Sequence, residues 1–303
     1  MRPLFSISTL FLLFASTLPL AAQTRTLAER LGYPANAKLL ILHADDIGVA
    51  HSQDSATFAA LDAGAVSSTS AMVPTPWITE VAAYAKTHPD ADIGLHLTLT
   101  SEWDTYKWGS VAPRDSVPSL YDSTGYLPND VPPVVAHAKP QEVERELRAQ
   151  IDRALALGIH PSHVDSHMGA LFSTPELIAT YVKVARSYHL PYLSVKSDPR
   201  SAPSDMMLDA VIVASPDVPR DHWMAFYTNA VAQLKPGVSE IIVHLAHDDS
   251  EMRAVTVNHE PYGAAWRQRD FDVVTSAEFR KALQANHVTL IKWRDIQKAM
   301  AQP

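Results

Sequence analysis

Apolar and polar positions follow two periods along most of the chain after its first 24 residues. Short runs rich in Val, Ile and Leu alternate with longer stretches in which apolar residues recur every three or four positions. These are the patterns of buried strands and of amphipathic helices. The stretch QEVERELRAQIDRALALG shows the helical pattern most clearly, with Val143, Leu147, Ile151 and Leu155 at four-residue spacing and Gly158 as a stop signal.

The same patterns divide the rest of the chain into candidate elements. The predicted strands are 39–43, 68–73, 93–97, 162–165, 192–195, 211–214, 240–245 and 288–291. The predicted helices are 53–62, 78–87, 141–157, 175–188, 222–234 and 276–285. About seven or eight β-then-α units without a linker predict one parallel α/β domain. We predict a (β/α) barrel, with a doubly wound open sheet as the alternative.

Residues 101–139 interrupt this alternation. The segment contains Trp103, Trp108, Tyr126 and five prolines, and it lacks a regular period. Long loops inside compact domains are commonly functional, and disordered segments are poor in aromatic residues. We therefore predict an ordered aromatic lid over the barrel mouth, with plain hydrophobic packing as the alternative.

The first 24 residues read MRPLFSISTLFLLFASTLPLAAQT, with one Arg, an apolar centre and small residues at Ala21 and Ala22. This is the layout of a secretory signal peptide at residues 1–22, so that the mature domain covers residues 23–303. An uncleaved membrane anchor is the alternative. The prediction is an exported bacterial protein, periplasmic or secreted, without stable membrane association after cleavage.

Composition narrows the class of protein. The chain has 303 residues, of which 47% are hydrophobic and 19% charged, which is ordinary for a soluble globular protein. Its formal net charge of -8, without a basic block, argues against nucleic acid as a partner. The absence of cysteine excludes disulfides and thiolate metal ligands. A homodimer is compatible with all of this.

Candidate functional residues gather at the ends of four predicted strands. They are Asp45 and Asp46 in ILHADDIGVA, His96 in GLHLTLT, His163, Asp165 and His167 in HVDSHMG, and His244 and His247 in IIVHLAHDD. Active sites of parallel α/β barrels form where the strands pass into their loops. These side chains are therefore predicted to meet at one end of the barrel.

Each candidate also has a structural explanation. Asp45 and Asp46 could cap the following helix, although that helix is predicted to begin near Gln53. A lone histidine in an apolar strand, such as His96 or His244, is commonly a hydrogen-bonded core residue. The alternation of HVDSH puts its polar residues on one side of the chain, where a solvent-facing strand edge is the alternative.

Taken together, these residues predict a metal site. Two imidazoles and one carboxylate around an open position suit a catalytic divalent cation. Zn²⁺ fits this mixture, and Mg²⁺, Mn²⁺ and Co²⁺ are alternatives. One carboxylate of the Asp pair would bind the cation while the other takes a proton from an activated water molecule. The predicted reaction class is metal-assisted hydrolysis.

The sequence blocks also resemble a known family. In order, the chain contains LLILHADDIG, GAVSSTSAMVPTP, DIGLHLTLT, SLYDSTGYLP, ERELRAQIDRALALGIHPSHVDSHMG and EIIVHLAH. These blocks resemble the YdjC-like carbohydrate deacetylases, relatives of chitooligosaccharide (diacetylchitobiose) deacetylase. The similarity covers roughly residues 38–296, and ADD-x-G, GLHLTLT and HVDSH are specific in combination.

The resemblance implies a deformed (β/α) TIM-like barrel that removes acetyl groups from N-acetylated sugars with a divalent metal. It implies that Asp45 is the general base and that Asp46, His96 and His167 hold the metal. It also implies that His244 is the acid that protonates the leaving amine, with His247 as the alternative. His163, Asp165 and His247 are expected to support the metal ligands from behind.

The chain departs from the family pattern around the substrate. Met168 and Gly169 stand where further histidines are usual, HLA replaces HPG at 244–246, and SEWDTYKW follows GLHLTLT. The sequence therefore predicts metal-assisted hydrolysis more strongly than it predicts a chitooligosaccharide substrate. Candidate substrate contacts are Trp103, Trp108 and Tyr126, which could stack on a sugar face, and Arg267, which could bind a substrate carboxylate or phosphate. The alternatives are a metal hydrolase of another amide or ester, and a carbohydrate-binding protein that has lost turnover.

Overall fold

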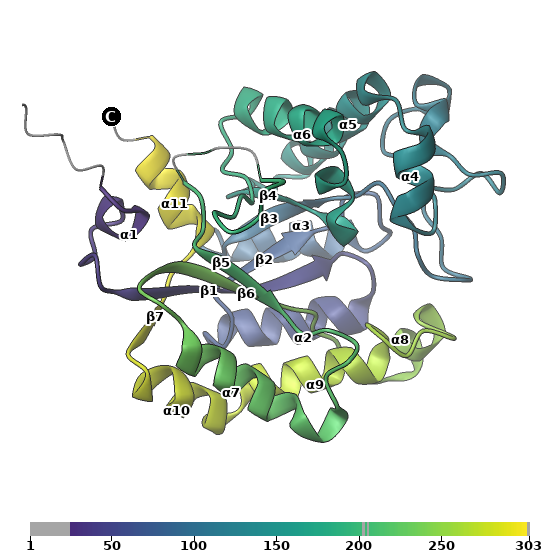
Figure 1. The fold of residues 1–303 in the computed structure, drawn as a ribbon. Coiled ribbons are helices and arrows are strands. Elements are labelled where there is room, and N and C mark those ends of the chain that lie inside the picture. The colour runs from purple at the N-terminus through teal and green to yellow at the C-terminus, as the bar shows by residue number, and fades with distance from the viewer. Residues whose placement is uncertain (1–24, 202–203, 205, 302–303) are drawn as a thin grey trace, which may run out of the picture.

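The computed structural model describes residues 25–201, 204 and 206–301, and Figure 1 shows their arrangement. The strands are β1 (Lys38–Ile47), β2 (Ser68–Ala71), β3 (Ile93–Leu97), β4 (Val164–Ser166), β5 (Ala210–Val213), β6 (Gly237–Val243) and β7 (Val288–Leu290). The helices are α1 (Leu27–Arg30), α2 (His51–Asp62), α3 (Ile78–Thr87), α4 (Val131–His137), α5 (Pro140–Ala156), α6 (Pro175–Ser187), α7 (Trp223–Gln233), α8 (Ser250–Val255), α9 (Ala264–Thr275), α10 (Ala277–Ala285) and α11 (Trp293–Met300). Four short 3₁₀ helices are η1 (Arg114–Ser116), η2 (Pro118–Leu120), η3 (His167–Phe172) and η4 (Arg220–His222). The predicted signal peptide lies outside the described residues.

One parallel sheet organises the domain. Its strand order is β4-β3-β2-β1-β6-β5, and β7 pairs with β1 as well. The carboxyl-terminal part of β1 pairs with β2 from His43 onwards, whereas β7 pairs with its first residues, Lys38 to Leu40. All of these pairings are parallel, so the carboxyl ends of the strands lie along the same side of the sheet.

The sheet is a barrel that does not close. Between β4 and β5, the residues that the structure describes make two isolated bridges, one joining Val164 to Tyr192 and one joining Val195 to Leu208. The strand predicted at 192–195 is therefore wrong as an element, because each bridge spans a single residue pair. The segment still carries backbone hydrogen bonds to both sides, from Leu193 N to Val164 O and from Leu208 N to Ser194 O. The predicted deformed (β/α) barrel is confirmed as an open, single-domain half-barrel.

Helices cover the outer side of the sheet. Figure 1 shows α5 and α6 above the sheet and α2, α7 and α10 below it. Successive residues of a strand face opposite sides, and β1 follows this rule. Leu40, Leu42 and Ala44 pack with the core under α2, α7 and α10. Leu39 and Ile41 pack with α11, and the same alternation carries His43 and Asp45 toward the inside of the barrel.

Residues 101–139 form a packed layer next to α5. The Glu146 carboxylate, buried on α5, accepts hydrogen bonds from the backbone N–H groups of Val111 and Ala112 at 2.9 and 2.8 Å. The side chains of Leu120 and Leu127 are buried in the same core as α5 and α6. Residues 101–139 are therefore packed against α5, as in the alternative prediction, and the structure does not show the predicted lid.

Within the part of the chain that the structure describes, no helix has the length and apolar character needed to cross a membrane.

Candidate active site

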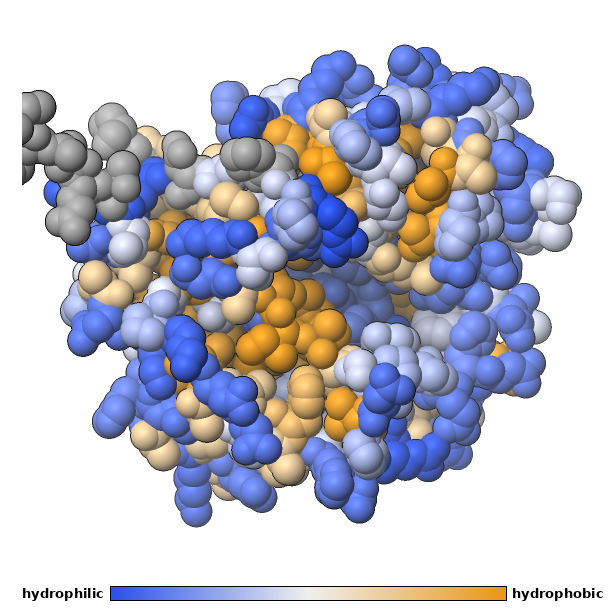
Figure 2. All heavy atoms as spheres, viewed as in Figure 1, coloured by the Kyte–Doolittle hydropathy of each residue, from blue (hydrophilic) through white to orange (hydrophobic). Residues whose placement is uncertain are grey.

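Five of the predicted catalytic and metal-binding residues line one cleft at the carboxyl ends of the strands. Its volume is about 800 Å³, and its lining includes Asp45, Asp46, His96, His167 and His244. Figure 2 shows a hollow at the centre of this face of the molecule. Residues from the four predicted strand ends thus line the same cleft.

Adjacent aspartates reach the same cleft because the backbone turns between them. In a regular strand, Asp45 and Asp46 would point to opposite faces. Asp46 instead has φ 72°, in the left-handed region that a non-glycine residue seldom adopts, and the β1–β2 register shifts between Ala44 and Ile47. Such local departures cost conformational energy and concentrate at functional sites.

Three side chains present potential ligand atoms to a common point. We call Asp46, His96 and His167 the cleft group, and all three are buried. Asp46 Oδ1 lies 3.3 Å from His96 Nε2 and 3.3 Å from His167 Nδ1. Asp46 Oδ1 is also buried without a hydrogen-bond donor. A buried, unpaired carboxylate oxygen is costly, and a cation at this point would satisfy it.

Both histidines of the cleft group are oriented by carboxylates from behind. His96 Nδ1 lies 2.6 Å from Asp165 Oδ1, and His167 Nε2 lies 2.9 Å from Glu102 Oε2. An ionised carboxylate only accepts hydrogen bonds, so each of these nitrogens carries the proton. The lone pairs of His96 Nε2 and His167 Nδ1 are then available on the side of Asp46. This carboxylate–histidine arrangement is typical of metal sites, and the donor set fits a divalent cation.

Neighbouring charged side chains shift the pKa values of all three residues of the cleft group. Burial opposes ionisation of Asp46, but the Arg267 guanidinium and the neighbouring rings of His167 and His96 hold its pKa well below the usual range. Burial also opposes a charged His167, yet Glu102 and Asp46 outweigh it and raise the pKa of His167 to about 9. The same balance, set by Asp45 and Asp165, holds the pKa of His96 well above its usual range. Without a cation, protons occupy the ligand positions.

Glu102 is a site residue that the sequence reasoning missed. It lies in SEWD, directly after the strand end that carries His96, in the segment that was predicted to be a lid. Burial alone would raise its pKa, but the charge of His167 and the hydrogen bond between them lower it. A carboxylate just past a strand end is the same signal that identified Asp45 and Asp46.

Asp45 lies beside the cleft group and faces His244. Its Oδ1 accepts a hydrogen bond from Ser70 Oγ at 3.0 Å and lies 3.0 Å from His43 Nε2, while its Oδ2 lies 4.0 Å from His244 Nε2. Burial lowers the pKa of His244 to about 4, more strongly than Asp46 can raise it. The His247 ring instead packs on Phe271 with ring centroids 5.1 Å apart, outside the cleft lining. His244 is therefore the histidine of this pair that faces the cleft.

The four predicted substrate contacts have different positions. Trp103 lines the cleft although its side chain is almost fully buried. Trp108 does not line it, because its ring is buried in the core and its Nε1 donates to Thr100 O at 2.8 Å. Tyr126 is exposed but also lies outside the lining. The structure does not place Trp108 or Tyr126 at the substrate.

Arg267 lines the cleft but is engaged by the protein. Its Nη2 donates to Asp46 Oδ2 at 2.8 Å and its Nε donates to Tyr262 O at 2.6 Å. These contacts use Nη2 and Nε, while Nη1 is buried without a hydrogen-bond partner, so the binding of a substrate carboxylate or phosphate stays a prediction. Arg267 fixes the outer oxygen of the Asp46 carboxylate, which leaves Oδ1 turned to the histidines.

The far wall of the cleft is aliphatic. It is formed by Leu193, Val195, Val211, Val213 and Ile242. Figure 2 shows an apolar area beside the hollow on this face. Ile242 precedes His244 by two residues on the same chain segment, so the apolar wall begins next to the polar centre.

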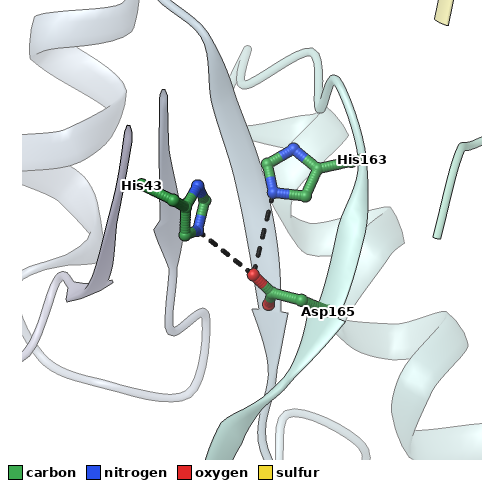
Figure 3. Close-up of side chains that lie close together, drawn as sticks. All are labelled: His43, His163 and Asp165. Carbon is green, nitrogen blue, oxygen red and sulfur yellow. Dashed lines mark ion pairs between the residues drawn. The ribbon is translucent and has the colours of Figure 1, made fainter. Parts of the chain in front are cut away.

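A second set of histidines and carboxylates lies inside the barrel. We call His43, His163 and Asp165 the buried group, which Figure 3 shows with both rings directed at one carboxylate. His43 Nε2 lies 3.2 Å, and His163 Nε2 3.7 Å, from Asp165 Oδ2. His163 and Asp165 were predicted to support the metal ligands. The contact between Asp165 and His96 fits that prediction for Asp165, and His43 was not predicted at all.

The fold and the site together define an open parallel (β/α) barrel with an Asp–His–His group in a cleft at the strand ends. The profile of the family described as YdjC-like protein matches residues 39–285, and the chain belongs to this family.

Relatives match the chain over most of its length. A protein named carbohydrate deacetylase from Thermus thermophilus is 31% identical over 290 residues, covering 90% of this chain and 99% of the relative. Another with that name, from Thermoanaerobacter pseudethanolicus, is 26% identical and covers 84% of this chain and 98% of the relative. The crystal structure of a candidate cellobiose-phosphate cleavage protein from Enterococcus faecalis V583 has a TM-score of 0.72 and 24% identity, covering 86% of this chain and 99% of that one. At that identity the structural match supports the fold alone.

Proposed function

We propose that this chain is a metal-dependent hydrolase that removes acetyl groups from N-acetylated carbohydrates. The observation that carries the proposal is the orientation of the cleft group: two imidazole lone pairs and the unpaired Asp46 Oδ1 face one point. The full-length relatives named carbohydrate deacetylases support the substrate class.

Asp46, His96 and His167 would hold the cation. Two imidazoles and one carboxylate favour Zn²⁺, with Mn²⁺, Co²⁺ and Mg²⁺ as alternatives. When bound, a divalent cation supplies a Lewis acid that polarises the acyl carbonyl and lowers the pKa of a water molecule. Asp165 and Glu102 keep the two rings in the tautomer that binds a cation, and Arg267 holds the other Asp46 oxygen.

Asp45 is the proposed general base. It is next to the cleft group and lines the cleft, and the cleft group offers three ligand atoms without it. Burial opposes its ionisation, but His96 and His43 outweigh burial and lower its pKa, so it is ionised at neutral pH. It can therefore accept the proton of the attacking water.

His244 is the proposed proton donor to the leaving amine. Because its pKa is about 4, largely through burial, the ring is neutral near pH 7. The proton that it delivers must first come from the attacking water, and Asp45 Oδ2, 4.0 Å from His244 Nε2, is the nearest carboxylate oxygen that could pass it on.

The aliphatic wall suits the acyl group. An acetyl methyl placed against Ile242 and Val213 would leave water while the carbonyl lies toward the cleft group. Trp103, which also lines the cleft, offers the edge of an aromatic ring to the sugar.

The test is an acetate-release screen. Protein stripped with a chelator would be incubated with N-acetylated monosaccharides and oligosaccharides, with and without Zn²⁺, Mg²⁺, Mn²⁺ or Co²⁺. The proposal expects metal-dependent acetate release from at least one of them. No release from any N-acetylated sugar with any of these metals would refute it. Release from O-acetyl esters alone would favour the alternative of an esterase, and sugar binding without release would favour a binding protein.

We also propose that the protein is exported. The support is the sequence of residues 1–22, with its apolar centre and small residues before Gln23. Expression in a bacterial host followed by amino-terminal sequencing should find Gln23 first in the periplasm or medium. A chain that keeps Met1 and stays in the cytoplasm would contradict this.

A further inference from the structure

The inference concerns His43, a buried residue that no part of the proposed mechanism uses. It lies on the inward face of β1, two residues before Asp45, and its side chain is fully buried. Its ring lies between carboxylates on three strands: Asp45 on β1, Asp165 on β4 and Glu240 on β6. Figure 3 shows the ring directed at Asp165.

One nitrogen of His43 serves two carboxylates. Its Nε2 lies 3.0 Å from Asp45 Oδ1 and 3.2 Å from Asp165 Oδ2. Ionised carboxylates only accept hydrogen bonds, so Nε2 must carry a hydrogen that the two share. Without this donor, two buried carboxylates would lose the N–H group that they share, and their mutual repulsion would be less well compensated, which is unfavourable.

Each of these carboxylates has its second oxygen committed to the cleft. Asp45 Oδ2 faces His244, and Asp165 Oδ1 accepts the hydrogen bond of His96 Nδ1 at 2.6 Å. A rotation of either carboxylate would therefore change the site. His43 Nε2 lies within 3.2 Å of both the proposed base and the carboxylate that orients a proposed metal ligand, whereas His96 Nδ1 lies 2.6 Å from Asp165 but 3.8 Å from Asp45.

The His43 ring is itself held in place. Its Nδ1 lies 3.0 Å from Ser68 Oγ and 3.8 Å from Glu240 Oε1, and Glu240 Oε1 accepts a hydrogen bond from Trp293 Nε1 at 2.8 Å. On its other side the ring meets His163 edge-on, with centroids 5.0 Å apart. The packing of His163 is tight, because it stacks on Trp293 and a Cβ added at Gly94 would collide with its ring.

We propose that His43 is a positioning residue that fixes Asp45 and Asp165 together through one shared N–H group, and so couples the base to the metal ligands. The inference rests on the proposed function for the role of Asp45. It predicts that losing the shared donor impairs turnover and cation binding at once, although His43 touches neither substrate nor the cleft group.

The same residues suggest a second cation site as the competing explanation, since His43, His163 and Asp165 could together offer three ligand atoms. The contacts argue against it. Both nitrogens of His43 already have partners within the protein, Ser68 at Nδ1 and the two carboxylates at Nε2. A cation would have to displace them in the closed interior of the barrel.

The test compares His43→Leu, which removes the donor, with His43→Gln, which keeps an N–H group at similar reach. His43→Leu should lower kcat by about 10- to 100-fold with KM little changed, and weaken Zn²⁺ affinity by about 10-fold or more. His43→Gln should recover a substantial part of both. If His43→Leu does not fold, His43→Asn, whose amide is too short to reach both carboxylates, takes its place. The Zn²⁺ titration needs no substrate, so the inference can fail or stand independently of acetate release by the unmodified protein.

Tyr181→Phe is the matched control. The buried Tyr181 hydroxyl donates to Val164 O and accepts from Leu193 N next to β4, and Tyr181 itself does not line the cleft. This variant should lose stability but keep kcat and Zn²⁺ affinity. Wild-type kcat and Zn²⁺ affinity in folded His43→Leu would overturn the proposal. So would two Zn²⁺ ions per unmodified chain and one in His43→Leu, which would instead indicate a second cation site.

Discussion

The cleft group and the buried group contain the same kinds of residue and lie in the same barrel, but their side chains are oriented differently. Each has two histidines and one aspartate within ligand distance of one another. In the cleft group, the outer ring nitrogens are held by Asp165 and Glu102, and the inner lone pairs face an unpaired oxygen. In the buried group, both nitrogens of His43 contact protein partners.

The difference lies in where the lone pairs point. In a metal site, one nitrogen of each histidine ring donates to a carboxylate, and the lone pair of the other nitrogen points to the open space where the cation binds. In a group with a structural role, the ring nitrogens form hydrogen bonds with neighbouring protein groups instead. Residue type and spacing alone do not distinguish a metal site from a structural group, but variants of the individual residues do.

The largest effect is expected from losing a ligand of the cleft group. Asp46→Ala removes the unpaired oxygen and leaves Arg267 without its carboxylate partner. Loss of the Lewis acid should cost about 5 kcal/mol of transition-state stabilisation, or roughly 10⁴-fold in kcat/KM. Metal analysis should find the variant empty, and full occupancy would remove Asp46 from the ligand set.

A smaller loss is expected when the base is removed but the ligands stay. Asp45→Asn keeps the shape of the side chain and removes its ability to accept a proton. Turnover should fall about 10³-fold, within the range for a general base, while Zn²⁺ content stays at the unmodified level. Turnover that does not change would exclude Asp45 as the base.

Removing the carboxylate that orients a ligand should weaken Zn²⁺ binding less than removing the ligand itself. Glu102→Gln removes the charge that orients His167, and Zn²⁺ affinity should fall about 10- to 100-fold. Asp122→Asn is the control in the same segment, because Asp122 bonds only within its own turn, to Thr124 and Tyr126. Equal affinities for the two variants would show that Glu102 does not act on the site.

The gentlest change is pH. Without a cation, Glu102 and Asp46 hold the pKa of His167 at about 9, against the effect of burial, so a cation must displace its proton. Zn²⁺ affinity should therefore rise with pH, by at least about tenfold per unit below pH 9, and level off above it. Calorimetry at several pH values measures this slope, and a flat profile would contradict the assignment of His167 Nδ1 as a ligand.

Most of the fold could be predicted because strand and helix periods are local. β3 and α3 have the predicted limits, and the four functional strand ends were recognised before any contact was known. What failed depends on distant partners. The aromatic residues of 101–139 have the composition of a lid, but contacts with α5, among them the hydrogen bonds to Glu146, make the segment a packed layer.

The site shows the same limit. His96 and Asp165 pair across 69 positions, and Glu102 and His167 across 65, so their hydrogen bonds cannot be read from spacing. Helix α9 was missed because its buried residues include Arg267 and Asp270, two charged residues that interrupt the apolar stripe. Asp46 contacts Arg267 across 221 positions, which the sequence does not reveal.

An anomalous difference map from crystals grown with Zn²⁺ tests the central claim most directly. It should show one peak, between Asp46 Oδ1, His96 Nε2 and His167 Nδ1, and none among His43, His163 and Asp165. A peak in the buried group, or none in the cleft group at full Zn²⁺ occupancy of the protein in solution, would contradict it.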